Sequence, residues 1–291
     1  MNLLLMTEQK NDLAVYVMTH GPECTWLADY CIPLEIGAAC RDKHCCELRD
    51  DMGEDTISEK DRLYCELTGL YWMWKNDQHE YVGLYHYRRI FHLTGKQIRK
   101  YLSEYDIIMP PMIPISPSVD KEYIRQKIPL DWEILKTVLL ERYPEYYESA
   151  KQIFPMNKSY AYNMFITNKK IFQDYCNWLF PLLQEIELRL TQHEDRHNQY
   201  LHEREKADYL VGYYERAIGF LAERLIHIYV VHHQLKVKEV KIWYVPPYVP
   251  LSPKCPQPLA NLATSNFLLY NVALFAQGKL YSLLRKIRSC P

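Results

Sequence analysis

Residues 81–89 read YVGLYHYRR, and this stretch decides the fold that we expect for the chain. Its first seven residues are mostly aromatic or aliphatic, and a short apolar run of this kind is typical of a buried β-strand. The strand leads directly into Arg88 and Arg89. Open α/β sheets bind ligands at the carboxyl ends of their strands, so the run predicts a strand that delivers two guanidinium groups to a binding edge.

Strands and helices alternate on the N-terminal side of this stretch. Residues 13–19 (LAVYVMT) predict an earlier buried strand. Residues 58–74 carry apolar side chains on one helical face, with Ser58 or Asp55 placed as N-cap. Strand, helix and strand in this order form a βαβ unit, which predicts an α/β fold.

The alternation continues towards the C-terminus. We predict further strands at 105–109, 160–167 and 235–245, and helices at 131–143, at 169–190 with a possible kink at Pro181, and at 208–231. A proline-containing loop at 110–117 is long enough to form a flap over a site. Six prolines between Pro246 and Pro258 end the regular structure. We therefore expect a catalytic domain over residues 1–250, followed by a linker and tail over residues 251–291.

The bulk composition is that of a soluble globular protein. The charges nearly cancel, with 35 basic and 36 acidic residues, so no whole-molecule field favours nucleic acid. Nine irregularly spaced cysteines favour reduced thiols in a cytosol over a disulfide framework. The apolar start at residues 1–6 is too short for a signal peptide, and no run approaches the roughly 20 apolar residues of a membrane span. We expect a cytoplasmic protein.

The strand exit His86-Tyr87-Arg88-Arg89 is the strongest local signal for a binding site. Arginine forms bidentate hydrogen bonds to phosphate and stays charged at every working pH. The two guanidinium groups and the imidazole could therefore hold a diphosphate without a metal ion. The alternative is that both arginines pair with acids at the rim of the sheet.

An acidic loop precedes the first predicted helix. Asp50 and Asp51 lie close to Gly53, Glu54 and Asp55. Carboxylates in such a loop could hold a divalent cation, Mn²⁺ or Mg²⁺, or contact ribose hydroxyls. Acids before a helix also stabilise its N-terminus, and this alternative has the greater weight.

A second carboxylate candidate lies on the last long predicted helix. Glu223 follows Arg216 by two turns on nearly the same face, with Gly219 between them. Glu223 could act as a general base that takes the proton of a hydroxyl group. An internal ion pair with Arg216 or Arg224 is the alternative.

Residues 193–197 (HEDRH) match the zinc-protease pattern HExxH. A catalytic zinc helix normally has a packed apolar back, whereas the whole stretch 192–206 is strongly polar. We interpret these residues as a solvated segment and predict no metal site there.

The motifs in their order resemble a bacterial glycosyltransferase family long described as a domain of unknown function in capsular and exopolysaccharide gene clusters. The matching pieces are Thr19-His20, Asp50-Asp51 with Gly53, Ile57-Ser58, residues 64–68 (YCELT), Tyr71-Trp72 with residues 74–76, residues 81–89, Asn163-Met164-Phe165, residues 175–180, and Arg216 with residues 219–220 and 223–225. The resemblance spans about residues 13–245 and leaves out the tail.

The resemblance implies a GT-A-like, Rossmann-type sheet that binds a nucleotide diphosphate sugar, and some relatives are similar to galactofuranosyltransferases that use UDP-galactofuranose. Taken with the residue patterns, it gives two sets of expected site residues. The donor-binding set is His20, Asp50, Ser58, Lys60, His86, Tyr87, Arg88, Arg89, Asn163 and Arg216; the catalytic set is Glu223 and Asp51. If Glu223 is not the base, the role falls to Asp50, Asp51 or Glu66.

The sequence departs from the family pattern at three places. Gly21 stands where relatives often have Lys, and Asp61 stands where Asn is usual. The DxD metal motif of GT-A enzymes is absent at the strand end, so a divalent cation is not settled as a cofactor and metal independence is open. We expect these departures to alter the donor pocket and leave the fold intact.

The expected function is transfer of a sugar, most simply from a UDP-sugar, to a growing or lipid-linked capsular or exopolysaccharide acceptor. The alternative is a non-catalytic nucleotide-sugar-binding or glycan-binding scaffold of the same fold. The presence of Arg88, Arg89 and Glu223 argues against this alternative.

Residues 265–288 combine apolar side chains at helical spacing with the basic cluster Lys279, Arg285, Lys286 and Arg288. We expect this tail to touch the inner face of the plasma membrane, the alternative being that it packs on protein.

Overall fold

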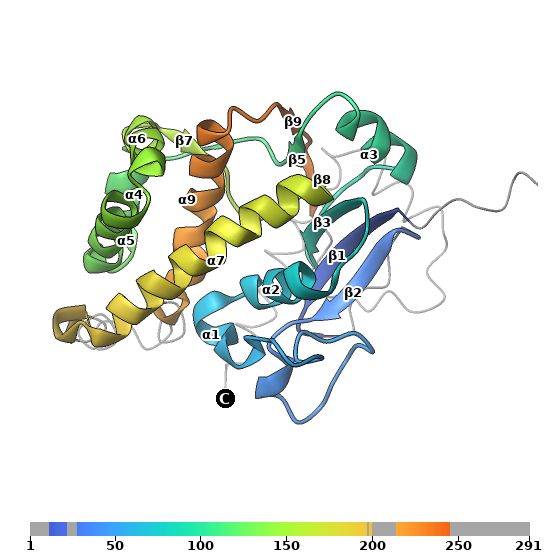
Figure 1. Cartoon of the computed structure of the whole chain (residues 1–291), viewed down its shortest axis with the longest axis horizontal. Coiled ribbons are helices and arrows are strands. Elements are labelled where there is room, and N and C mark those ends of the chain that lie inside the picture. The colour runs from blue at the N-terminus through green and yellow to red at the C-terminus, as the bar shows by residue number, and fades with distance from the viewer. Residues whose placement is uncertain (1–11, 22–27, 197, 200–213, 245–291) are drawn as a thin grey trace, which may run out of the picture. The chain divides into compact units, whose positions relative to one another are not determined.

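The computed structural model describes residues 12–21, 28–196, 198–199 and 214–244. A mixed β-sheet forms the centre of this body (Figure 1). Its strands lie in the order β2 (Cys31–Glu35), β1 (Leu13–Thr19), β3 (Tyr81–His86), β8 (Phe165–Asn168), β5 (Ile107–Met109) and β9 (Val237–Glu239). The strands β2, β1 and β3 are parallel, β8 is antiparallel to both β3 and β5, and β9 is parallel to β5. The α/β class predicted from the sequence is confirmed.

Two short strands extend the sheet beyond the end of β3. The chain turns after His86, and β4 (Arg89–Phe91) pairs back through Arg89. β10 (Ile242–Tyr244) lies beside β4. The turn places Tyr87 and Arg88 at the carboxyl end of a central strand.

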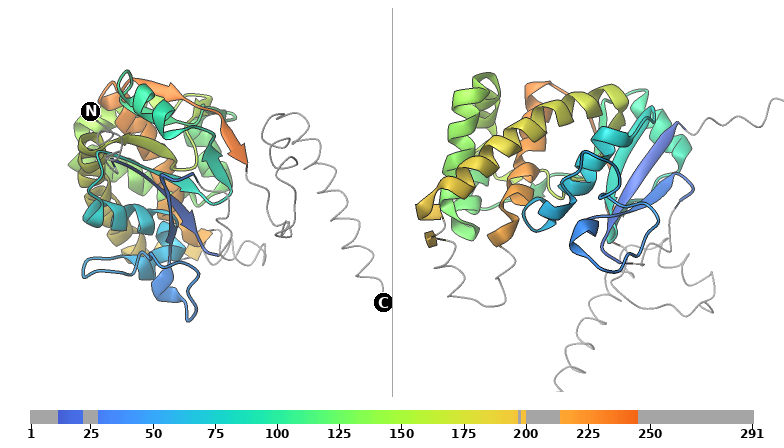
Figure 2. Two further views of the ribbon diagram at one scale, coloured as in Figure 1. Left: turned by 90° about the vertical axis from the view of Figure 1, so that its right-hand side faces the viewer. Right: turned by 60° about the horizontal axis from the view of Figure 1, so that its bottom comes forward.

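Helices lie on both faces of the sheet. They are α1 (Asp61–Tyr64), α2 (Leu67–Asn76), α3 (Gly95–Leu102), α4 (Val119–Gln126), α5 (Pro129–Arg142), α6 (Pro144–Ile153), α7 (Lys169–Gln192) and α9 (Ala217–His232), with 3-10 turns η1 (Ala38–Cys40), η2 (Ser58–Lys60) and η4 (Tyr214–Arg216). In Figure 2, α4, α5 and α6 (green) form a group away from the sheet, and α7 and α9 lie between this group and the strands.

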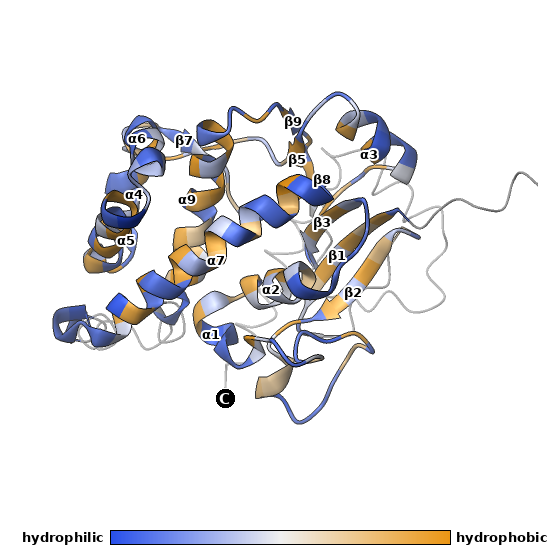
Figure 3. Ribbon diagram, in the orientation of Figure 1, coloured by the Kyte–Doolittle hydropathy of each residue, from blue (hydrophilic) through white to orange (hydrophobic). Residues whose placement is uncertain are grey.

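Successive side chains of β1 point to opposite faces of the sheet and belong to two different hydrophobic cores. Tyr16 and Met18 belong to the larger core, which includes side chains of α2, α7 and α9. Val15 and Val17 belong to a smaller core, which includes Ile98 of α3. Successive side chains of a strand point to opposite faces, so the uninterrupted apolar run of β1 is explained by burial on both sides (Figure 3).

The single helix predicted after Ser58 is wrong. The segment consists of η2, α1 and α2, and it breaks at Cys65, whose φ of 54° is left-handed. Neither predicted N-cap caps a helix there, because the Ser58 hydroxyl donates to Asp50 and the Asp55 carboxylate accepts from Tyr71. Because of this break, Glu66 belongs to neither α1 nor α2 and lies directly before the first residue of α2.

Other boundaries differ for local reasons. The strand predicted at 160–167 begins only at Phe165, because Tyr162 and Asn163 have left-handed φ angles of 76° and 47°. The segment predicted as one strand at 235–245 forms β9 and β10 instead. The helix predicted at 131–143 is confirmed as α5, and α7 runs through Pro181.

The predicted flap at 110–117 is held by strand pairing. β6 (Ile113–Pro114) pairs with β7 (Lys158–Ser159), and the Ile115 amide donates to the carbonyl of Asn157 over 2.7 Å. The loop is thus anchored to the segment that leads into β8.

Residues 200–213 and the linker and tail predicted at 251–291 lie outside the described residues. In the described part, no helix combines the length and hydropathy that crossing a membrane would need.

Candidate functional site

The carboxyl ends of β1 and β3 bring two predicted histidines to one edge of the sheet. Met18 lies opposite His86 in the parallel register, and the Tyr87 amide donates to the Met18 carbonyl over 3.1 Å. His20 follows two residues after Met18. Burial, followed by the charges of Arg89, Arg88 and His20, lowers the pKa of His86 to about 3. His86 is therefore a neutral imidazole at physiological pH.

Arg41, which the sequence analysis missed, orients His20. Its guanidinium donates to the His20 carbonyl over 2.7 Å and lies 2.5 Å from the ring Nδ1. A guanidinium can only donate, so Nδ1 accepts and the proton of the neutral ring is assigned to Nε2. Desolvation lowers the pKa of His20. His20 thus offers an N–H donor to a ligand at this edge.

Asp61 adds an acceptor to the same place. Its Oδ1 is buried and has no hydrogen-bond partner in the described part of the chain. Gly37 packs directly on the carboxyl group, since a β-carbon at Gly37 would lie 2.5 Å from Asp61 Cγ. Burial raises the pKa of Asp61, and the charges of His20, Arg41 and Arg216 act to lower it. A buried acceptor without a partner among such donors is suited to a ligand hydroxyl.

Asp50 and Ser58 support this edge from behind. Asp50 accepts from the amides of Gly37 (2.8 Å) and Ala38 (3.1 Å) and from the Ser58 hydroxyl (2.5 Å), and Ser58 accepts from the Ala39 amide (3.0 Å). Both side chains are fully buried. They hold the loop that leads to Arg41 in place. They would therefore act on a sugar donor through the position of this loop and not by touching the donor themselves.

Two further predicted residues are engaged elsewhere. Lys60 pairs with Glu187 of α7 over 2.9 Å, and the Tyr64 hydroxyl donates to the same carboxylate oxygen over 2.7 Å. Asp51 accepts from Arg49 over 2.9 Å. The structure does not join Lys60 or Asp51 to the residues at the strand ends.

The acidic loop was also considered, with less weight than its role before a helix, as a holder of Mn²⁺ or Mg²⁺, and three of its carboxylates are engaged by protein donors. Both oxygens of Asp50 accept from amide or hydroxyl groups, Asp51 pairs with Arg49, and Asp55 pairs with Lys75 at 2.9 Å. Among the described residues, no three His, Cys, Asp or Glu side chains are grouped to hold a metal ion.

Two carboxylates meet near the entry to β8. The Asn163 amide nitrogen donates to Glu66 Oε1 over 2.8 Å and to the Gly219 carbonyl over 3.3 Å. The Tyr162 backbone amide donates to Glu223 Oε1 over 3.2 Å. Glu223 Oε2 accepts from Arg224 over 2.7 Å, so the ion pair considered as an alternative forms with Arg224.

The environment of Glu66 favours its protonated form. Burial is the largest cause, and it raises the pKa of Glu66 to about 7. The charge of Glu223 raises this pKa as well, whereas the hydrogen bond from Asn163 and the charge of Arg89 lower it. A carboxyl group that titrates near neutral pH can accept or donate a proton in a reaction. Sequence reasoning named Glu66 only as a substitute base, because no local pattern marks a break in the helix.

The two arginines of the strand exit are available to a ligand. Arg89 lies over the Tyr162 ring at 4.4 Å, and its Nε is buried without a hydrogen-bond partner. Arg88 is exposed and lies over the Tyr87 ring at 4.9 Å. In the described part of the chain neither arginine forms an ion pair with an acid, so the rim ion pairs considered from the sequence are not observed there.

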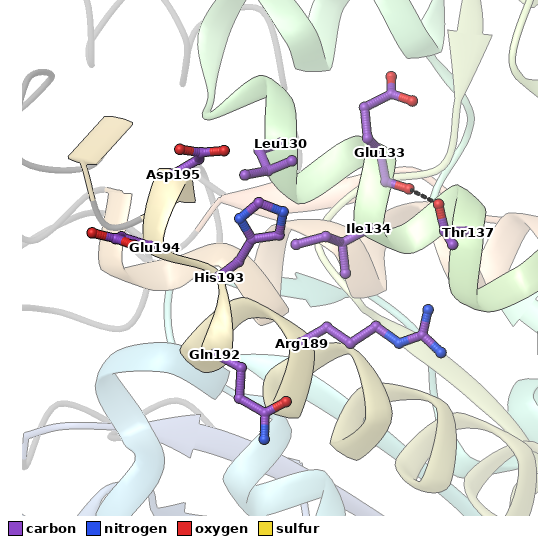
Figure 4. A pocket seen from close by; sticks show the side chains of 9 residues that line it. All are labelled: Leu130, Glu133, Ile134, Thr137, Arg189, Gln192, His193, Glu194 and Asp195. Carbon is purple, nitrogen blue, oxygen red and sulfur yellow. Dashed lines mark hydrogen bonds between the residues drawn. The ribbon is translucent and has the colours of Figure 1, made fainter.

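One pocket borders these groups, and a larger one lies elsewhere in the described part of the chain. A pocket of about 200 Å³ is lined by Glu223, Arg224 and residues of β6, α4 and the 160–161 segment. A larger one of about 570 Å³ lies between α5 and the end of α7, and includes His193, Glu194 and Asp195 (Figure 4). None of the residues at the strand ends lines the larger pocket. The neighbouring Arg196 pairs with the buried Asp131 over 3.0 Å.

The chain is similar to known proteins in its sequence family and in its fold. The model of a family described as "Domain of unknown function (DUF4422)" matches residues 14–234. A solved structure, described as the apo structure of the bifunctional glycosyltransferase WbbM, is similar with a TM-score of 0.70 and 27% sequence identity. The match covers 81% of this chain and 46% of the other, so the chain spans less than half of that protein. None of the curated proteins matches the sequence. The similarity to this structure supports the GT-A-like α/β fold.

The raised pKa of Glu66 predicts a pH-dependent loss of stability. In the unfolded chain the group titrates near 4.5 and in the folded protein near 7, so its stabilising contribution is present at low pH and is lost as pH rises through 7. Glu66→Gln removes this loss. The unfolding free energy of the variant minus that of the wild type should therefore increase by about 1–3 kcal/mol as the pH rises from 5 to 8, as measured by urea denaturation. The exposed Glu104→Gln serves as control, and a pH-independent difference for Glu66→Gln would contradict the assignment.

Proposed function

The chain belongs to the DUF4422 family, and from this premise we propose that it is a glycosyltransferase that uses a nucleotide diphosphate sugar. One observation carries the proposal. The turn at Tyr162 and Asn163 joins the carboxylates Glu66 and Glu223 to Arg89 at the carboxyl end of a sheet strand. Groups able to bind a diphosphate thus lie beside groups able to take a proton. The similarity to a glycosyltransferase structure gives independent support.

The donor half of the proposed site is cationic. His20, oriented by Arg41, supplies an N–H donor, and Asp61 supplies an unpaired acceptor oxygen. Ribose and base carry donors and acceptors of both kinds. Arg88 and Arg89 supply the guanidinium groups for the diphosphate. The resemblance noted from the sequence favours UDP as the nucleotide, with UDP-galactofuranose among the donors to test.

The proposed reaction moves one proton and breaks one bond. An acceptor hydroxyl gives its proton to Glu223 or Glu66 while its oxygen bonds to the anomeric carbon of the donor sugar. The bond from that carbon to the diphosphate breaks, and the nucleoside diphosphate leaves with the electron pair. Arg88 and Arg89 neutralise the charge that develops on it. We propose a growing or lipid-linked capsular or exopolysaccharide chain as the acceptor.

The competing function is a non-catalytic nucleotide-sugar-binding or glycan-binding scaffold. A pure binder needs no group that titrates near pH 7, so the pKa of Glu66 favours the enzyme. A scaffold would be stabilised by a UDP-sugar without releasing UDP, whichever acceptor is added.

Arg88→Ala and Arg89→Ala should each weaken the binding of UDP by about tenfold or more. A hydrogen bond to a charged group contributes about 1.5–3 kcal/mol, and 1.4 kcal/mol corresponds to a factor of ten. Calorimetric titration with UDP measures the affinity. Arg142→Ala is the matched control, because that guanidinium is exposed on α5 and lies 3.9 Å from Glu185. Unchanged affinity in both strand-exit variants would remove them from the site.

Glu223→Gln and Glu66→Gln test the carboxylates. An amide keeps the shape but cannot accept the proton, and a general base commonly contributes about 10²–10⁴-fold to turnover. We expect at least one of the two variants to lose turnover in this range while it still binds UDP. Release of UDP from UDP-sugars with candidate acceptors is the assay, with Glu104→Gln as control. If both variants keep activity within a few-fold of the wild type, the base lies elsewhere.

The proposal includes a membrane contact through residues 265–288, which lie outside the described residues. Each of the four basic side chains near the end of this segment would contribute about 1 kcal/mol of binding free energy at an anionic surface. We expect the full-length protein to sediment with anionic liposomes at low salt, and a chain that ends at Leu251 to stay folded and remain in the supernatant. Failure of the full-length protein to sediment, or unfolding of the truncated chain, would assign the tail to protein packing.

A further inference from the structure

The pocket of about 200 Å³ lies beside the proposed base, and none of the residues expected to bind the donor lines it. Its walls are the β6 loop, the end of α4, the segment before Tyr162, and the face of α9 that carries Glu223 and Arg224. Glu223 therefore borders the pocket on one side and accepts from the Tyr162 amide on the other. A group bound in this pocket would meet the same carboxylate that the reaction needs.

Strand pairing and helix contacts hold the walls of this pocket in place. Ile113 pairs with Ser159 across β6 and β7, and the Val119 amide at the start of α4 donates to the Met156 carbonyl over 2.9 Å. Arg125 of α4 donates to the Ser116 carbonyl over 2.9 Å and so ties the helix to the loop. Pocket walls fixed by strand pairing and helix packing favour a preformed binding site over one that a ligand induces.

The size of the pocket limits its occupant. Sites that hold drug-sized ligands enclose roughly 300–1,000 Å³, and this one is smaller. It has room for one monosaccharide unit and not for a longer piece of glycan. Ile113, Pro114 and Ile115 give it an apolar side against which the C–H groups of a sugar ring can pack.

The charges of the pocket select a neutral occupant. Arg224 donates to Glu122 over 2.9 Å and to Glu223 over 2.7 Å, so each of its two terminal nitrogens already holds a carboxylate. Arg125 is the remaining cation of the lining, and it is tied to a backbone carbonyl. The two arginines and two glutamates cancel in charge. A sugar carboxylate would face Glu122 and Glu223, whereas sugar hydroxyls can donate to both.

We propose that this pocket is the acceptor subsite and that it takes one neutral hexose unit, with a hydroxyl directed to Glu223. The inference rests on the proposed function, because it assigns a place to the second substrate of the same reaction. Gln126, exposed at the end of α4 and part of the lining, sits where a larger side chain would close the pocket.

The test compares two tryptophan variants on one helix. Gln126→Trp fills the mouth of the pocket, and Ile124→Trp is the matched control, since Ile124 is 38% exposed on α4 and does not line the pocket. Ligand-observed NMR in the presence of UDP measures the binding of methyl galactopyranoside, methyl glucopyranoside, methyl mannopyranoside and methyl glucuronide. Thermal shift with UDP reports the donor side of each variant separately.

We expect at least one neutral glycoside to bind to the wild type and to Ile124→Trp, and to bind at least tenfold more weakly to Gln126→Trp. Stabilisation by UDP should be equal in all three proteins. The subsite is overturned, and the proposed function is not, if UDP stabilises the wild type but no neutral glycoside binds. Preferred binding of the glucuronide, or unchanged binding to Gln126→Trp, overturns the subsite in the same way. Failure of UDP and UDP-sugars to stabilise the wild type would instead remove the proposed function and the subsite with it.

Discussion

The left-handed turn at Tyr162 and Asn163 is the constraint on which the candidate site depends. Non-glycine residues in this conformation cost of the order of 1–3 kcal/mol each, with asparagine tolerating it best, and they persist where surrounding contacts fix them. Here the contacts are the hydrogen bonds to Glu66 and Glu223 and the stacking of Arg89 on the Tyr162 ring. One turn thus fixes the relative positions of an arginine and two carboxylates that come from three different elements.

A second irregularity makes this arrangement possible. The left-handed Cys65 ends α1 and directs Glu66 towards the turn. Gly219 lets α9 approach this break closely, because a β-carbon there would lie 3.0 Å from Cys65 Sγ. The same close approach places the Gly219 carbonyl within reach of Asn163. The absence of a side chain at one position therefore brings the helix that carries Glu223 against the segment that carries Glu66.

Sequence reasoning succeeded where one periodic signal dominated. The apolar runs of β1 and β3 are buried on both faces, and their pattern predicts strands at nearly the right bounds. It failed where tertiary contacts override local preference, as in the break at Cys65 and the turn at Tyr162. Arg41 gave no motif because its role arises only when separate loops meet at the sheet edge, and Asp61 was marked only as a departure from the family pattern. An Asn such as Asn163 inside an apolar strand pattern is the one signal that could have marked the turn.

The turn also divides the charges of the site. Arg89 lies over the Tyr162 ring and Arg88 over the Tyr87 ring, whereas Glu66 accepts from Asn163 and Glu223 accepts from the Tyr162 amide. In the proposed reaction the leaving diphosphate gains negative charge and the acceptor hydroxyl loses a proton. A cationic half stabilises the first change and an acidic half accepts the second. Because Arg89 also lowers the pKa of Glu66, the two halves are electrostatically coupled. A diphosphate bound at Arg89 would offset that charge and make Glu66 more basic, so the affinity of the base for its proton would rise when the donor is in place.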